Sequence, residues 1–419
     1  MSGPLASRAA VAPFRGWRIV GVGFFTQAIS IGFTVGTFSL FLPSLVEEFG
    51  ASHASVSSGI GIFMAVMTLT GPWIGRLLDR GSIRGVMALG ALTSAASFAL
   101  MSLAGSLWQL GVLFGLGAAL GTAMLGPLAS ATVVSKWFER MRGRAQGVTN
   151  MGGPAGPLLL AMAAGWWIEE LGWRSTLRIY ALGTLLAIPP VWWVVRNRPE
   201  DVGQHVDGDL SLRAPLAGEH VHGEWGAARL LREPRFWLLV LPMGLLMGVS
   251  SGWVAHFAAF ASDHGAGIQG ASLALAGGAG IGLLGAVGFG VMADRLDPRR
   301  LLQGILAAHV AVYAFLAAGS EWGALAAAMI ALGFPGGGMM PVYVALIGRL
   351  FGPASFGQVM GLGGLVMLPF ATGAPVVAGL LHDLRGSYTP TLLLFAALLA
   401  LAVLLVAFLP LAPAGARRD

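Results

Sequence analysis

Long apolar stretches separated by short polar ones run through almost the whole chain. Cutting at charges and turn residues leaves stretches of about 20 residues or more, enough to cross ~30 Å of hydrocarbon as helices. The period-two alternation of membrane barrel strands is missing from them. The pattern therefore predicts an all-α membrane protein with twelve transmembrane helices, at 17–42, 56–75, 85–104, 109–134, 145–168, 175–195, 236–262, 272–292, 299–318, 322–348, 358–381 and 389–411.

One polar segment is much longer than the others, and it divides the predicted helices into two sets of six. Because few apolar residues interrupt it, we expect a linker between two helical bundles. The predicted organisation is an N-terminal tail (1–16), an N-terminal six-helix bundle (17–195), a linker (196–235), a C-terminal six-helix bundle (236–411) and a C-terminal tail (412–419).

The basic residues predict how the chain crosses the membrane, because Lys and Arg favour the cytoplasmic side of short loops. If the N-terminus is inside, all but three of the 25 basic residues fall on the cytoplasmic side. We therefore expect both termini and the linker to be cytoplasmic. Lys136 is the only lysine, and this preference for arginine is typical of a GC-rich bacterial genome. A multi-pass protein of the cell inner membrane is the predicted location.

Composition excludes several classes of protein. The chain is 56% hydrophobic and 11% charged, against about 25% charged in soluble proteins, so a soluble enzyme is not expected. It contains no cysteine, which excludes disulfides, thiolate metal sites and cysteine nucleophiles. The net charge of +6 lies in short loops between apolar runs, so no nucleic-acid partner is predicted. We expect a monomer in the lipid bilayer, with no catalytic residues, no cofactor and no metal site.

Two similar loops suggest an internal repeat. GRLLDRGSIRG begins at Gly75 and GVMADRLDPRR begins at Gly290, each directly after the second span of its bundle. Duplicated six-helix bundles are a transporter architecture with a substrate site near the middle of the membrane. The residues shared by the two loops are Gly75, Asp79, Arg80 and Arg84, matched by Gly290, Asp294, Arg295 and Arg299.

The first loop resembles the signature loop of the major facilitator superfamily, and the second resembles its weaker copy. Other segments are similar to the monocarboxylate-transporter and oxalate/formate-antiporter branch: Gly16-Trp17-Arg18, KWFERMRGRAQG at 136–147, GWR at 172–174, RPEDVG at 198–203, EPRFW at 233–237 and FGPASFGQVMGL at 351–362. This resemblance implies two pseudo-symmetric six-helix bundles that alternate between two open states. We expect the shared loop residues to act as a cytoplasmic gate, the alternative being that they only fix topology.

In that superfamily helices 1, 4, 7 and 10 line the central cavity, so the resemblance directs attention to their polar residues. In helix 1, Gln27, Ser30, Thr34 and Thr37 fall on one helical face. Such a stripe either lines a cavity or packs against another helix. The segment from Gly333 to Pro341 is expected to break helix 10 and expose carbonyls. The predicted substrate residues are Gln27, Thr34, Thr122, Asn150, Trp253, His256 and Tyr343.

His256 is the ionisable residue that we place inside a cavity-lining span, so it is the candidate for proton coupling. The alternative is a neutral histidine bonded to a backbone carbonyl near the outer interface. Carboxylates are expected only in loops and at span ends, and Ala286 stands where related anion carriers have an arginine. We therefore expect the substrate to be a small organic solute, and a monocarboxylate or related metabolite fits this pattern best. The proton is a possible partner, and efflux of hydrophobic or drug-like compounds is the alternative function.

Overall fold

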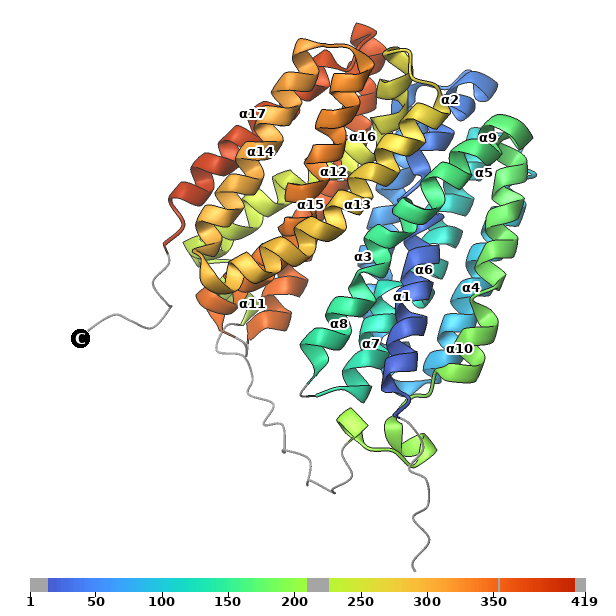
Figure 1. Ribbon diagram of the computed structural model, residues 1–419, viewed down its shortest axis with the longest axis vertical. Coiled ribbons are helices and arrows are strands. Elements are labelled where there is room, and N and C mark those ends of the chain that lie inside the picture. The colour runs from blue at the N-terminus through green and yellow to red at the C-terminus, as the bar shows by residue number, and fades with distance from the viewer. Residues whose placement is uncertain (1–13, 140, 209–225, 353–354, 411–419) are drawn as a thin grey trace, which may run out of the picture.

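A computed structural model describes residues 14–139, 141–208, 226–352 and 355–410, and its regular elements are all helices (Figure 1). Both predicted tails and the middle of the predicted linker lie largely or wholly outside these residues. The N-terminal half contains α1 (Gly16–Gly32), α2 (Phe38–Phe49), α3 (His53–Arg80), α4 (Ile83–Met101), α5 (Leu107–Val112), a π-helical turn (Leu113–Ala118), α6 (Ala119–Leu125), α7 (Pro127–Trp137), α8 (Arg142–Asn150), α9 (Gly152–Leu185) and α10 (Ile188–Val194).

Two short 3-10 turns, Pro199–Val202 and Val206–Gly208, follow this half. The C-terminal half then contains α11 (Ala227–Leu230), α12 (Pro234–Asp263), α13 (Ile268–Arg295), α14 (Pro298–Ala318), α15 (Trp322–Phe351), α16 (Phe356–Arg385) and α17 (Thr389–Ala407).

Ten helical segments of the described chain are long and apolar enough to cross a membrane. One of them, Gly143–Val194, has 52 residues and reverses direction at Gly172, whose φ of 79° is the left-handed conformation that glycine favours. It therefore makes two passes. The first predicted span is divided into α1 and α2, which are individually too short to be counted. The described helices thus accommodate the twelve predicted passes.

The break between α1 and α2 is held by an aromatic side chain from α9. The ring of Tyr180 stacks on Phe33 at 4.2 Å, and its hydroxyl donates to Thr37 Oγ1 over 2.8 Å. The hydroxyl of Thr37 in turn donates to the Gly32 carbonyl at the end of α1. These bonds satisfy polar groups that the interrupted helix leaves free.

The predicted break in helix 10 is wrong, because α15 runs without interruption through Gly333 to Pro341. Gly333 and Gly337 lie directly against the carbonyls of Gly278 and Gly282 in α13, where any side chain would collide. The glycines of this segment therefore allow two helices to pack closely. This close packing supports a continuous helix despite the two prolines.

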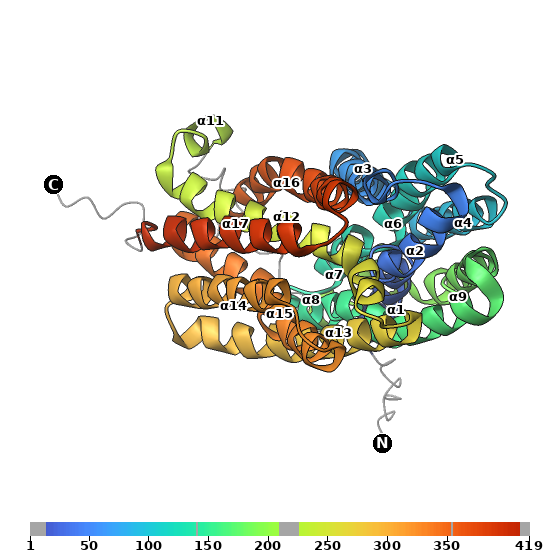
Figure 2. The ribbon, with the colours of Figure 1, turned by 90° about the horizontal axis from the view of Figure 1, so that it is seen from above.

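Figures 1 and 2 show α1 to α10 and α11 to α17 as two groups of helices placed side by side. In Figure 1 the groups meet at the upper end, where α3 begins and α16 ends, and separate toward the lower end. We call the upper end the arginine-poor end. The lower end, which carries Arg76, Arg80, Arg295 and Arg349, is the arginine-rich end.

Candidate functional site

Three polar side chains meet where α1, α7 and α8 pack together. Gln27 Nε2 donates to Ser130 Oγ over 2.8 Å and to Asn150 Oδ1 over 3.2 Å. Gln27 is buried, with 2% of its surface exposed, whereas Asn150 is exposed. We call these three residues the amide cluster. The structure therefore brings together two of the predicted substrate residues, Gln27 and Asn150, and adds Ser130 to them.

Asn150 lies on a face of α8 that other helices leave uncovered. Gly143, Gly147 and Asn150 follow one another at intervals of four and three residues, which places them on one side of the helix. A Cβ atom added at either glycine would meet no atom of another described segment within 4 Å. The amide cluster thus borders open space rather than packed protein.

The hydroxyls of the remaining polar residues of the first span bond backbone carbonyls of that same span. The Ser30 and Thr34 hydroxyls donate to carbonyls of α1, from Gln27 and Ser30 respectively. Thr122 is fully buried in α6, and its hydroxyl has no hydrogen-bond partner in the described chain. Of the two alternatives for the polar stripe, helix packing describes Ser30 and Thr37.

A cavity of about 680 Å³ lies within the N-terminal half, between the break after α1, the start of α3 and the fourth pass. Its wall is almost entirely apolar, with Phe38, Phe114 and Trp108 among the lining residues. Phe114 belongs to the π-helical turn, a feature that is frequent at functional sites. Thr34 is the only predicted substrate residue that lines this cavity, so the structure does not gather the seven residues around one cavity.

His256 lies in α12 near the arginine-poor end, buried and hydrogen-bonded through both ring nitrogens. Nε2 is 2.9 Å from the Pro375 carbonyl, and Nδ1 is 2.9 Å from the Tyr388 hydroxyl. A carbonyl only accepts, so Nε2 carries the proton and Tyr388 donates to Nδ1. Burial raises the pKa of Tyr388 above its ordinary value, which keeps this donor protonated. The bond to a carbonyl matches one of the two alternatives for His256, and proton coupling remains a prediction.

Trp253 and Tyr343 are both buried within the C-terminal half. Trp253 packs its ring against Phe257 and Tyr313, at centroid distances of 5.6 Å each. The Tyr343 hydroxyl has no hydrogen-bond partner in the described chain and lies against Gly363 of α16, where an added Cβ would be 2.7 Å away. Trp253 therefore contributes to helix packing. Tyr343, by contrast, places a buried hydroxyl without a hydrogen-bond partner among the described residues in the interior.

The charged residues of the predicted gate contact partners in their own half of the molecule. Asp79 Oδ1 is 3.8 Å from Lys136 Nζ, and the Arg84 guanidinium lies 4.9 Å above the ring of Trp192. In the other half, Arg299 donates to the Leu409 carbonyl over 3.2 Å. Gly75 and Gly290 have open space around their Cα atoms, and Arg80 and Arg295 are exposed. Asp294 lies in α13, and its side chain is outside the described atoms.

At the arginine-poor end, by contrast, α3 packs closely against α16 of the other half. An added Cβ at Gly61 would lie 2.7 Å from the Thr372 carbonyl, and one at Gly379 would lie 2.5 Å from the Ala54 nitrogen. Between these contacts, the Ser57 hydroxyl donates to the Pro375 carbonyl over 3.0 Å. Since His256 bonds the same carbonyl, His256 is one hydrogen bond away from the contact between the halves.

The same faces of α3 and α16 continue toward the arginine-rich end without touching. Gly75 follows Ser57 by 18 residues, and Gly361 precedes Gly379 by 18 residues, which is about five turns at 3.6 residues per turn. Among the described residues, none comes within 4 Å of a Cβ added at Gly75 or Gly361. Each helix thus has one face that is covered at one end and open at the other.

Sequence reasoning missed the residues that join the two halves. Asp383 accepts from the backbone N–H groups of His53 and Ala54, over 3.0 and 3.1 Å, and so caps the start of α3. His53 and Asp383 are 330 positions apart in the chain, and each resembles an ordinary loop residue. The sequence offers no signal that would pair them, because each lies outside the predicted spans and outside any motif.

Comparison with known proteins places the chain in a family. Residues 24–318 and 260–419 match the Major Facilitator Superfamily. The chain belongs to this superfamily. It is therefore a multi-pass membrane transporter and not an enzyme, as the sequence predicted.

Individual relatives of the transporter fall into more than one group. It is 27% identical to monocarboxylate transporter 11 of Homo sapiens over 400 residues, which cover 92% of this chain and 80% of that protein. It is 28% identical to the multidrug resistance protein MdtG of Dickeya zeae (strain Ech586) over 334 residues, covering 75% and 76% of the two chains.

Among solved structures, the transporter is similar to a bacterial homologue of the human lysosomal transporter Spinster, in an inward-facing and occupied conformation. The TM-score is 0.75 at 15% identity, covering 95% of this chain and 97% of the other. This likeness shows the fold, and it confirms the predicted fold class.

Proposed function

We propose that this transporter carries a small monocarboxylate, or a related organic metabolite, by alternating access. The observation that carries the substrate class is the similarity to monocarboxylate transporter 11 over 92% of the chain. The polar groups described above fit a weakly polar, singly charged solute. Because they include uncharged amide and hydroxyl donors, they can bind a carboxylate without the desolvation cost of a buried cation.

The amide cluster is our proposed binding element. Gln27 Nε2 engages the Asn150 side-chain oxygen, which leaves the Asn150 amide nitrogen with two protons to donate. That nitrogen lies beside the open glycine face of α8, where a solute entering from the arginine-rich end can reach it. Thr34, Thr122, Trp253 and Tyr343 are proposed as further contacts. Of these, Tyr343 has the strongest support, because its buried hydroxyl has no hydrogen-bond partner among the described residues.

Alternating access is supported by the register of the contacts between the halves. The helices α3 and α16 run antiparallel, so a residue later in α3 faces a residue earlier in α16. Ala54 faces Gly379, and Gly61 faces Thr372. Continuing that register brings Gly71 opposite Gly361 and Gly75 opposite Gly357. These four glycines are open here, and we propose that they pack together when the arginine-rich end closes. The loop residues from Asp79 to Arg84 and from Asp294 to Arg299 would then latch that end.

We further propose that a proton accompanies the solute and that His256 binds it. His256 and Ser57 share the Pro375 carbonyl, so a change in the charge of the imidazole would act directly on the contact between α3 and α16. Following the arginine bias, we assign the arginine-rich end and both termini to the cytoplasm of a bacterial inner membrane, with the protein as a monomer.

Efflux of hydrophobic compounds is the second candidate. Two observations favour it: the apolar cavity of about 680 Å³ in the N-terminal half, and the similarity to a multidrug resistance protein. Trp108, which lines this cavity, is 69% exposed, so the cavity can communicate with the lipid phase.

The test is uptake into proteoliposomes of a panel of labelled small carboxylates and their neutral analogues, with and without an inward acid gradient. We expect saturable carboxylate uptake that Gln27→Ala lowers about tenfold, the effect of losing roughly 1.4 kcal/mol of hydrogen bonding. Ser30→Ala is the matched control, because its hydroxyl donates to a carbonyl of its own helix, that of Gln27. Movement of an apolar compound without any carboxylate flux would overturn the substrate assignment.

A further inference from the structure

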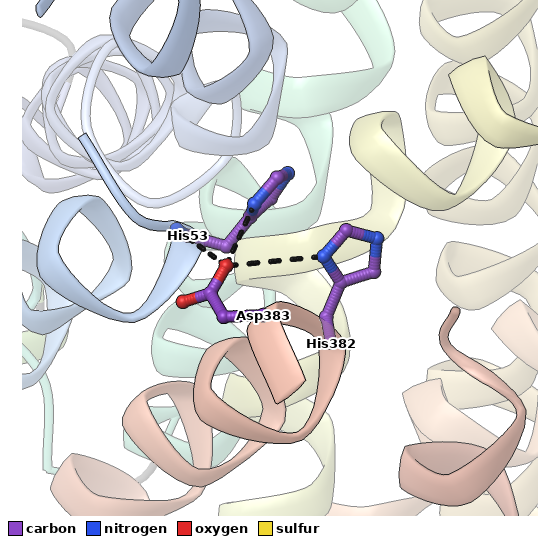
Figure 3. A group of neighbouring side chains, drawn as sticks. All are labelled: His53, His382 and Asp383. Carbon is purple, nitrogen blue, oxygen red and sulfur yellow. Dashed lines mark hydrogen bonds and ion pairs between the residues drawn. The ribbon is translucent and has the colours of Figure 1, made fainter. Parts of the chain in front are cut away.

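The closed arginine-poor end contains a cluster of two histidines and an aspartate drawn from both halves (Figure 3). His53 begins α3 in the N-terminal half, whereas His382 and Asp383 lie in the last turn of α16. His53 Nδ1 is 3.1 Å from Asp383 Oδ1, and His382 Nδ1 is 4.0 Å from the same oxygen. One ligand atom from each residue lies within 4.8 Å of the other two.

The hydrogen bonds of His382 leave one ring nitrogen free for a ligand. Its Nε2 is 3.2 Å from Asp263 Oδ2 at the end of α12, and the carboxylate fixes the ring proton on that nitrogen. In the neutral ring, Nδ1 then carries the lone pair. It is buried without a hydrogen-bond partner in the described chain, and it points toward Asp383 (Figure 3). A carboxylate behind a histidine is the usual arrangement when the other nitrogen binds a metal.

The chemistry and spacing of the three residues suit zinc. Zn²⁺ binds histidine nitrogen and carboxylate oxygen at about 2.0–2.2 Å, so tetrahedral ligand atoms stand roughly 3.3 Å apart. The two distances to Asp383 Oδ1, 3.1 Å from His53 Nδ1 and 4.0 Å from His382 Nδ1, bracket that value. Zinc would displace the proton that His53 Nδ1 donates to this oxygen, because a metal-bound histidine nitrogen is deprotonated. Three protein ligands leave a fourth position for water. A hollow of about 360 Å³ is lined by Asp263, which bonds His382, and by Tyr388, whose ring lies 4.2 Å from that of His382.

We propose that His53, His382 and Asp383 form a zinc site that holds the arginine-poor end closed. The ligands come together only when α3 and α16 touch at this end. A metal that binds one conformation and not the other stabilises the one it binds. Zinc therefore favours the conformation described here and arrests the transport cycle. The site is separate from the amide cluster and does not depend on which solute is carried.

The test is a calorimetric titration of the purified, chelator-treated full-length protein in nanodiscs with ZnCl₂, and with MgCl₂ in parallel. We expect one saturable zinc site per chain and no magnesium binding, because magnesium prefers an octahedral oxygen shell. His53→Gln and His382→Gln should each weaken zinc binding at least tenfold. Asp263→Asn leaves the three ligands in place and should weaken binding about 10- to 100-fold through the orientation of His382.

His205→Ala is the matched control, because this histidine is exposed near the arginine-rich end and should leave binding unchanged. Melting temperatures without metal verify that each variant is folded, and if a glutamine variant is not, Asp263→Asn decides. Zinc should also raise the melting temperature of the wild type and inhibit uptake in proteoliposomes, but not in His382→Gln. Absence of saturable binding, or wild-type affinity in the folded variants, would overturn the proposal. Because binding is read without any solute, failure of the transport assignment would leave this result intact.

Discussion

The two ends of the molecule use similar elements in opposite ways. At the arginine-poor end, Gly61 and Gly379 bring α3 and α16 into backbone contact, and Asp383 reaches across to cap α3. At the arginine-rich end, glycines on the same helical faces remain uncovered, and Asp79 pairs with Lys136 of its own half. The surface that closes one end is therefore continued along each helix. One rocking motion can therefore exchange which part of it is buried.

The largest expected effect comes from placing a leucine at matched positions of this surface. Gly379→Leu should lose most transport and lower the stability by about 1–3 kcal/mol, because the side chain collides with the backbone of α3. Gly361→Leu should lose transport as well, by preventing closure of the other end. Its melting temperature should not fall, because that position is open here and leucine favours a helix over glycine.

Thermal unfolding and uptake of the two variants, measured side by side, check this prediction. A Gly361→Leu variant with normal transport would show that the open face of α16 does not pack against α3 in any necessary state. Equal destabilisation of the two variants would contradict the difference between the ends.

An intermediate effect is expected at His256, which connects the closed end to the interior of the C-terminal half. His256→Ala removes bonds to Pro375 and Tyr388 and should cost about 1–3 kcal/mol of stability. Uptake should fall and lose its response to an acid gradient. His309→Ala is the control, because His309 is also buried but bonds a carbonyl of its own helix over 2.8 Å. Uptake by His256→Ala that still rises with the gradient would exclude His256 as the proton site.

The smallest effect is expected from Tyr343→Phe, which removes a hydroxyl without a partner. Stability should be unchanged or higher, because a buried unsatisfied polar group is costly. Transport should fall about fivefold if the hydroxyl binds the solute, which corresponds to roughly 1 kcal/mol for one hydrogen bond. Tyr180→Phe provides the contrast, since it loses a bond to Thr37 and should lower the melting temperature. Unchanged solute affinity in Tyr343→Phe would remove this residue from the proposed binding site.

The membrane passes could be predicted from sequence because the thickness of the bilayer fixes the length of a spanning helix. Backbone groups in lipid must be satisfied within each helix, so about 20 apolar residues read as one pass wherever they occur. Local irregularities were less predictable. The glycines and prolines of α15 suggested a broken helix. In the structure these glycines instead let the backbone of α13, at Gly278 and Gly282, pack closely against α15. The break after α1 depends on Tyr180, which is distant in sequence.

The sequence by itself determined the all-helical membrane fold and the family, since each depends on local hydropathy or contiguous motifs. It also indicated Gln27 and Asn150, because polar residues are rare in apolar helices. Only the tertiary structure decided that these two share a hydrogen bond with each other and that His256 bonds Pro375. Only it united His53 with His382 and Asp383. The physical reason is that such contacts depend on how separate helices dock, which no single stretch of the chain encodes.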